Sequence, residues 1–211
     1  MAQIRVIVLP RTNIMSTPET PSPPELLLWT DCEFTGLDIV NGHRIIEIGT
    51  LVTTLALEEV DSYESFVQYD WDAMRSLMST NPWWDGRDDD IARMKIGVEA
   101  GKLPGVIDAD LADLTDAYFS GQTPSLCGNS VHSDKKHIDV QFPEFASRLD
   151  YRIIDVTSLK LLASAYRNVR YEKKSYQHYA LQDIRESVDE LRFLLRELGI
   201  AHLPEMAPEV I

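Results

Sequence analysis

The sequence predicts an α/β fold, in which helices flank a mixed central sheet within one domain. Apolar β-type runs occupy the first part of the chain, strand-like and helix-like segments alternate afterwards, and a long amphipathic helix follows. A chain of 211 residues, of which 44% are hydrophobic, can bury one substantial core. We expect the domain at residues 25–200, between a flexible extension at residues 1–24 and a tail at residues 201–211.

The first half of the domain is predicted to be rich in strands. Asn41-Gly42 lies between two apolar runs and is typical of a hairpin connection, and Asn81-Pro82 is a signal that ends a helix. The expected elements, in chain order, are strands at residues 25–33, 44–55 and 63–69, a helix at residues 71–80, and short helices and loops across residues 83–105.

The second half alternates helices and strands. The last helix has the clearest pattern, because Leu181, Ile184, Val188 and Leu191 recur every three or four residues before Gly199 stops it. The expected elements, in chain order, are a helix at residues 106–119, a strand at 125–130, a helix at 135–149, a buried strand at 151–156, a helix at 158–166 and a helix at 181–198.

The net charge of −14 bears on the partners of the protein. A protein that tracks long DNA or RNA needs a basic stripe to neutralise phosphates, so a long nucleic acid is disfavoured. Residues 120–175 carry more lysine and arginine than acid, which suits a small anionic ligand held by a local patch. The sequence has no stretch of the length needed to span a membrane.

Two features bear on the compartment. Cys32 and Cys127 have no second cysteine at metal spacing, which favours a reduced, cytoplasmic protein. Residues 1–18 contain two arginines and no acid, as a mitochondrial transit peptide would. We favour a flexible extension, or translation from Met15, because the amphipathic arginine-rich pattern of a transit peptide is missing.

Asp31 and Glu33 follow an apolar run, and Cys32 separates them. Side chains in a strand alternate between faces, so the two carboxylates project from the same side. Their repulsion destabilises the strand unless a cation lies between them, and hard divalent cations prefer oxygen ligands.

Three residues far down the chain complete a constellation with this pair. Asp134, His178 and Asp183 taken singly are typical of a helix start, a loop and a solvated helix flank. Together with Asp31 and Glu33 they supply four carboxylates and one histidine. That set suffices for phosphodiester cleavage with two metal ions, in which the histidine takes a proton from the attacking water.

Several segments also resemble a known family. They read Trp-Thr-Asp-Cys-Glu-Phe-Thr-Gly-Leu-Asp at residues 29–38, Arg-Ile-Ile-Glu-Ile at 44–48, Leu-Cys-Gly-Asn-Ser-Val-His-Ser-Asp-Lys-Lys at 126–136, Tyr-Arg-Ile-Ile-Asp-Val-Thr-Ser-Leu-Lys at 151–160 and His-Tyr-Ala-Leu-Gln-Asp-Ile-Arg-Glu-Ser at 178–187. In this order they resemble the motifs of oligoribonucleases, which belong to the DEDDh 3′→5′ exonuclease superfamily. The resemblance covers residues 26–198.

The resemblance implies an RNase H-like exonuclease fold and a homodimer. It implies 3′→5′ hydrolysis of short RNA, especially dinucleotides, to nucleoside 5′-monophosphates with two Mg²⁺ or Mn²⁺ ions. Asp31, Glu33, Asp134 and Asp183 match the metal ligands of the family, and His178 matches the general base.

The resemblance also implies a set of substrate contacts. Leu37 matches the leucine that wedges against the bases. Ser130, Arg152 and Ser158 match positions that cap the 5′ phosphate of the substrate, and Tyr151 matches one that completes the cap from the partner subunit.

The chain departs from the family pattern in three places. Trp83 or Trp84 supplies the aromatic residue for base stacking, and the sequence leaves open which one does so. The segment 94–97 replaces a histidine-containing segment, and Gln182 stands where the family has an aspartate.

Two other interpretations stay open. A general or proofreading-type 3′→5′ exonuclease would act on longer DNA or RNA, and the net charge of −14 disfavours it. A binding module that keeps the fold without activity is disfavoured because all five reactive positions are present.

Overall fold

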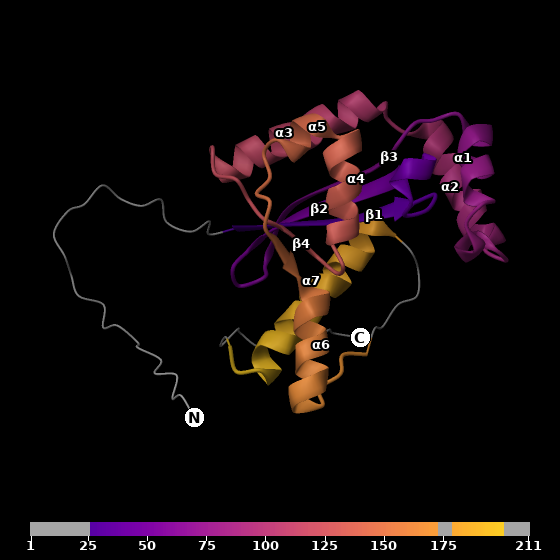
Figure 1. Ribbon diagram of the computed structural model, residues 1–211. Helices are drawn as coiled ribbons and strands as arrows, with labels where there is room; N and C mark the ends of the chain where they lie inside the picture. Colours follow the sequence, from indigo (N-terminus) through magenta and orange to yellow (C-terminus); the bar gives the residue numbers. More distant parts are fainter. Residues whose placement is uncertain (1–25, 173–178, 201–211) are drawn as a thin grey trace, which may run out of the picture.

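The structure is a computed structural model that describes residues 26–172 and 179–200 (Figure 1). The predicted extension at residues 1–24, the predicted tail at residues 201–211 and His178 lie outside the described residues. Within the described part, no helix combines the length and the apolar character that a membrane span requires.

The sheet is mixed, as predicted. Its strands within the described residues are β1 (Leu26–Phe34), β2 (Ile45–Thr54), β3 (Glu59–Phe66), β4 (Leu126–Gly128) and β5 (Ile153–Asp155), in the spatial order β3-β2-β1-β4-β5. The first three strands pair antiparallel, whereas β4 runs parallel to β1 and β5 runs parallel to β4.

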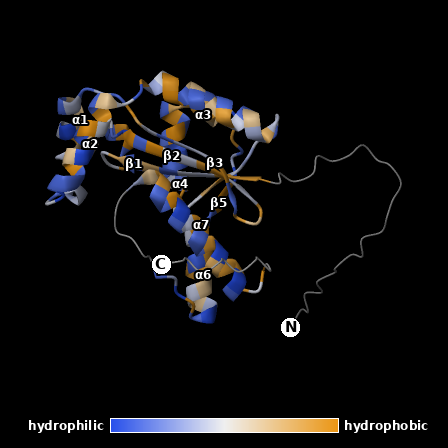
Figure 2. Ribbon diagram, turned by 180° about the vertical axis from the view of Figure 1, so that it is seen from behind, coloured by the Kyte–Doolittle hydropathy of each residue, from blue (hydrophilic) through white to orange (hydrophobic). Residues whose placement is uncertain are grey.

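Helices cover both faces of the sheet (Figure 1). They are α1 (Trp71–Met78), α2 (Asp88–Ala100), α3 (Pro104–Phe119), α4 (His132–Gln141), α5 (Pro143–Ala146), α6 (Val156–Arg167) and α7 (Ala180–Glu197), with 3-10 turns at Ile39–Asn41 and Pro82–Trp84. Figure 2 shows hydrophobic and hydrophilic residues interspersed along the helices, and the hydrophobic clusters pack helical apolar residues against the sheet, which is the amphipathic arrangement that the sequence predicts.

Three hydrophobic clusters divide the core. One packs α3, α4 and α5 on one face of β1 and β2, and a second packs α6 and α7 on the other face. A third lies around Ile46, where α1 and α2 cover the end of the sheet. The carboxylates of β1 therefore lie in a strand that is fixed from both sides.

Several predicted elements differ from the structure. The helix predicted at residues 135–149 is two helices, because Pro143 has no N–H to donate and Phe142 leaves the helical conformation with φ −131°. Residues 88–100, predicted as short helices and loops, form the continuous helix α2, whose first turn carries three aspartates that favour a helix N-terminus. The third strand lies at 59–66, earlier than predicted.

The strand predicted as buried at residues 151–156 is a short edge strand. It spans only Ile153–Asp155, and Ile154 on it is exposed. Tyr151, just before it, is 78% exposed. Alternating apolar residues at the edge of a sheet look the same in sequence as those of a central strand, although only the central strand is covered on both faces.

Close backbone contact fixes α7 on the sheet. A Cβ atom at Gly49 of β2 would lie 2.8 Å from the backbone nitrogen of Leu181. Only glycine lets the first turn of α7 approach the strand this closely. This contact brings the start of α7 beside the two acids of β1.

Candidate metal centre

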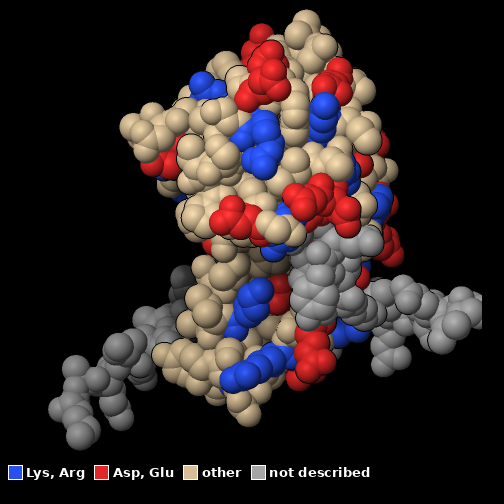
Figure 3. Space-filling model, turned by 90° about the vertical axis from the view of Figure 1, so that its right-hand side faces the viewer, with Lys and Arg blue, Asp and Glu red and all other residues tan. Residues whose placement is uncertain are grey.

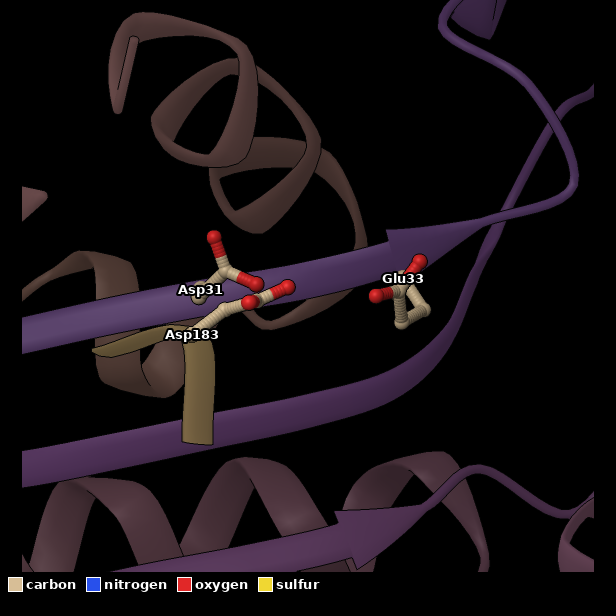
Figure 4. A group of neighbouring side chains, drawn as sticks. All are labelled: Asp31, Glu33 and Asp183. Atoms are coloured by element: carbon tan, nitrogen blue, oxygen red, sulfur yellow. The ribbon is translucent and has the colours of Figure 1, made fainter. Parts of the chain in front are cut away.

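Asp31 and Glu33 project from the same face of β1, and α7 brings Asp183 to them. Ligand oxygens of these three side chains all lie within 4.8 Å of one another. Figure 4 shows the carboxylates of Asp31 and Asp183 side by side, with Glu33 one step further along the strand. The antiparallel register shifts directly after Glu33, so the alternation that aligns the two acids ends at that residue.

Glu33 has a strongly perturbed protonation. Its side chain is 8% exposed. Burial, together with the nearby Glu47 and Asp183 carboxylates, raises its pKa from 4.5 to about 8, although Arg93 acts in the opposite direction. A bound cation would relieve this repulsion, and three carboxylates are the donor set that Mg²⁺ and Mn²⁺ prefer. The residues present therefore fit a divalent metal ion.

Asp134 is not part of this group. It lies in the first turn of α4, is 5% exposed, and contacts Cys32, whose side chain points away from Asp31 and Glu33. Burial raises the pKa of Asp134 well above its usual range. Among the described residues, its buried Oδ1 atom has no hydrogen-bond partner. The structure thus brings together three of the four predicted metal ligands.

Two pockets flank the carboxylate cluster. One has a volume of about 420 Å³ and is lined by Glu33, Phe34, Gly36, Leu37, Asn81 and Trp83. The other has a volume of about 260 Å³ and is lined by Asp31, Asn129, Lys160, Tyr171, Asp183, Glu186, Ser187 and Glu190. A ligand that spans both pockets passes over the three carboxylates.

The structure distinguishes the two tryptophans. Trp83 is 38% exposed and lines the larger pocket opposite Leu37, which is 60% exposed. Trp84 is buried in the third hydrophobic cluster, where its indole N–H donates to the Thr35 carbonyl at 3.0 Å. Trp83 is therefore the partly exposed ring beside this pocket, with the Arg87 guanidinium 3.9 Å from its centroid, and Trp84 is a core residue.

Ser130 lies in a tight turn after β4. Its φ of 51° is in the left-handed region, and its N–H donates to Asp155 Oδ1 and to Thr157 Oγ1, each at 3.0 Å. The Ser130 hydroxyl pairs with Thr157 Oγ1 at 3.2 Å, whereas Ser158 is exposed beside it. Thr157 was not among the residues selected from the sequence. Its place directly before Ser158, inside a segment that resembles the family, was a signal that could have identified it.

Arg152 and Tyr151 lie at the edge of the sheet, next to β5. The Arg152 guanidinium stands 4.4 Å from the Tyr151 ring centroid and pairs with Asp150 at 3.3 Å. Neither side chain lines the two pockets beside the carboxylates. Within one chain, the structure does not bring them to the cluster.

Further polar residues missed from the sequence line or support the smaller pocket. Asn129 Nδ2 donates to Ser187 Oγ at 2.9 Å and to Glu190 Oε2 at 3.0 Å, and the Lys160 ammonium pairs with Glu190 at 3.1 Å. Asn129 and Lys160 belong to segments that carry the family resemblance, so the motifs contained a signal for them. The contacts of Asn129 and Lys160 with Ser187 and Glu190 of α7 could not be predicted from the positions of these residues along the sequence.

The mixed five-stranded sheet with helices on both faces is that of the RNase H-like exonuclease fold. The Exonuclease family model matches residues 110–191. The fold is similar to that of E. coli exonuclease I in a metal-free complex with single-stranded DNA, with a TM-score of 0.59 and 10% identity, covering 83% of this chain and 41% of that one. This chain thus spans less than half of that protein, and the likeness concerns the fold alone.

Curated relatives narrow the class. An oligoribonuclease of Thiobacillus denitrificans is 36% identical over 174 residues, which cover 81% of this chain and 93% of the relative. An oligoribonuclease of Francisella tularensis subsp. holarctica is 32% identical over 178 residues, which cover 82% and 95% of the two chains. The chain belongs to the oligoribonuclease family, and the resemblance of its motifs is confirmed.

Proposed function

We propose that this protein is a 3′→5′ exoribonuclease that hydrolyses short RNA, especially dinucleotides, to nucleoside 5′-monophosphates. The observation that carries the proposal is the cluster of Asp31, Glu33 and Asp183, with a pocket on each side, in a member of the oligoribonuclease family. The cluster supplies the chemistry, and the two pockets suit the two halves of a dinucleotide.

The carboxylates would hold two divalent ions, Mg²⁺ or Mn²⁺. We assign Asp31, Glu33 and Asp183 as direct ligands. Asp134, which lies outside that group, is proposed as the fourth carboxylate on the motif match alone. When bound, such ions stabilise the attacking and leaving oxygens of an in-line displacement at phosphorus. The elements that carry these ligands, β1 and α7, are fixed by packing before any ion arrives.

The remaining residues would bind the substrate and move the proton. His178, whose role rests on the motif match, takes the proton from the attacking water. Trp83 stacks on a base and Leu37 wedges against the bases, because both line the larger pocket beside Glu33. The water oxygen would then bond to the phosphorus while the P–O3′ bond to the preceding nucleotide breaks. The released 3′ oxygen takes up a proton from solvent, and the 3′-terminal nucleotide leaves as a 5′-monophosphate.

Charge supports a short substrate. Figure 3 shows acids and bases interspersed over one face of the molecule, and the coloured part of that face carries no continuous basic track. With a net charge of −14, a long polyanion is repelled, whereas one or two phosphates need only local donors. Ser130, Arg152 and Ser158 would cap the 5′ phosphate of such a substrate.

We further propose a homodimer. Large apolar side chains are exposed on and beside β5 and on α6, namely Tyr151 (78%), Ile154 (38%), Leu161 (64%), Leu162 (54%) and Tyr166 (82%). A patch of this kind marks an interaction surface. A second copy docked there would cover it and bring the partner subunit's Tyr151 to the phosphate cap. A cytoplasmic location and an exonuclease domain at residues 25–200 complete the proposal.

The test is a cleavage assay on end-labelled RNA of graded length with Mg²⁺ or Mn²⁺. We expect rapid conversion of a dinucleotide to monomers and slower turnover as length increases. Asp134→Ala and His178→Ala should abolish turnover without unfolding the protein, while Lys95→Ala, an exposed change on α2, should not alter it. Absence of cleavage of any two- to five-nucleotide RNA overturns the proposal, and preference for a twenty-mer supports the general exonuclease instead.

A further inference from the structure

Arg93 of α2 lies beside the carboxylate cluster, close enough for its charge to act on Glu33. Its guanidinium makes a bidentate pair with Glu47 of β2, at 2.8 and 3.0 Å. Glu47 is 1% exposed, and the Arg93 side chain is 20% exposed. Glu47 of β2 is also the residue directly opposite Glu33 of β1 in the antiparallel pairing. The ion pair therefore lies on the strand next to a proposed metal ligand.

The same guanidinium contacts the start of α7. It lies 4.4 Å from the ring centroid of Tyr179, the residue that precedes the helix. The Tyr179 carbonyl accepts a hydrogen bond from the backbone N–H of Asp183 at 2.8 Å. Arg93 therefore touches the turn that sets the position of Asp183 as well as the strand that lies beside Glu33.

Close packing of α2 on the sheet allows the Arg93 side chain to extend to Glu47. A Cβ atom at Gly97, one turn after Arg93, would lie 2.3 Å from the Phe66 ring. Glycine at that position lets α2 pack closely against β3 and carries Arg93 over the sheet edge to Glu47. Glu64 of β3 accepts a hydrogen bond from the backbone N–H of Leu181 at 3.1 Å. This bond holds the first turn of α7 on the sheet.

Stability alone is a poor reason for this pair. A buried ion pair loses much of its Coulombic gain to desolvation, and apolar residues of similar volume commonly stabilise as well or better. The pair does supply rigid, directional contacts, because a guanidinium is planar and binds a carboxylate through two parallel hydrogen bonds. Its value lies in the geometry that it fixes.

We propose that Arg93 is a positioning residue for the metal centre: by holding Glu47 and stacking on Tyr179, it sets Glu33 and Asp183 at the spacing that binds the ions. This inference rests on the proposed function only in taking the cluster as a metal site. It assigns Arg93 no contact with RNA or with the reacting atoms. Its loss should therefore weaken metal binding and lower kcat while KM for RNA stays the same.

The experiment measures Mn²⁺ affinity, by the electron paramagnetic resonance signal of free Mn²⁺, in the full-length protein without RNA. Arg93→Lys keeps the charge but loses the bidentate fork and the flat stacking surface. We expect its Mn²⁺ affinity to fall about tenfold, the lower end of what such supporting residues contribute. The matched control is Arg185→Lys, which alters an equally bidentate pair with Glu59 at an exposed position on α7 and should leave the affinity unchanged.

A double variant guards against simple unfolding. Glu47→Gln with Arg93→Gln removes both buried charges together, so neither is left unpaired. We expect this protein to fold, to unfold at a urea concentration similar to wild type, and still to bind Mn²⁺ weakly. Wild-type Mn²⁺ affinity and kcat in Arg93→Lys, or in the double variant, would overturn the inference. If wild type binds Mn²⁺ but cleaves no RNA, the proposed function fails. The positioning role of Arg93 is then still decided by the Mn²⁺ affinities of wild type and the Arg93 variants.

Discussion

Replacing Glu33 with glutamine should change how the stability of the metal-free protein depends on pH. Glu33 is buried among acids, and its pKa in the folded protein is raised from 4.5 to about 8. The folded state therefore holds the proton more tightly than the unfolded state does. The stabilisation is fully present below pH 4.5, falls as the pH rises toward about 8, and is lost above it.

The magnitude follows from the same two values. Each pH unit between them corresponds to 1.36 kcal/mol, so Glu33 can lower the free energy of unfolding by at most about 5 kcal/mol across this range. Glu33→Gln keeps the shape of the side chain and removes its ionisation. The variant should lose most of this pH dependence and, without metal, should be more stable than wild type on the alkaline side. Asp134, whose pKa is also raised, titrates in both proteins, so its effect cancels in the comparison.

The assay is urea unfolding in EDTA at about pH 5 and about pH 8.5, values that bracket the titration of Glu33. Added Mn²⁺ should restore the stability of wild type at the higher pH and should act much less on the variant. Glu99→Gln, which removes an exposed carboxylate from α2, is the control and should leave the wild-type slope unchanged. Equal slopes in wild type and Glu33→Gln would refute the reasoning.

Two further predictions concern the tryptophans and the exposed apolar surface. Trp84→Ala should lower the free energy of unfolding by about 3–5 kcal/mol, because it empties a core position. Trp83→Ala should change that free energy by less than about 1 kcal/mol but raise KM for a dinucleotide about tenfold, because stacking is lost. Urea unfolding and steady-state kinetics measure the two effects. A large loss of stability in Trp83→Ala, with the raised KM found in Trp84→Ala instead, would contradict the proposed roles. Light scattering should give wild type the mass of a dimer. Leu162→Asp on α6 should be monomeric and should cleave dinucleotides slowly. The control is Leu103→Asp, which changes an exposed residue just before α3 and should stay dimeric. A monomeric wild type would contradict the proposed interface.

The sequence predicted those features that depend on local rules. Period-two alternation placed Asp31 and Glu33 on one face of β1, and the repeat of apolar residues located α7 almost to the residue. Pro143 carried a signal that α4 would end before it, and a stricter reading of that residue predicts the break. Asp183 was selected as one of the acids that complete the constellation, and the family resemblance supported it, because no spacing connects it to β1.

The features that the sequence did not predict depend on tertiary contacts. Trp83 and Trp84 are adjacent and chemically identical, and only the packing of α1 and α2 decides which one is buried. Arg93 and Glu47 lie on separate elements, and their pairing depends on how closely α2 approaches β3 at Gly97. Local patterns contain no information on such distances.

The docking of α7 also bears on when the carboxylate cluster is completed during synthesis. Asp31 and Glu33 belong to the first described strand, whereas Asp183 belongs to the last described helix. A domain generally folds as a unit, and α7 is translated after all the strands of the sheet. Until α7 has been translated, the nascent chain carries only two of the three clustered carboxylates. The complete cluster therefore forms only when the last described helix docks on the sheet.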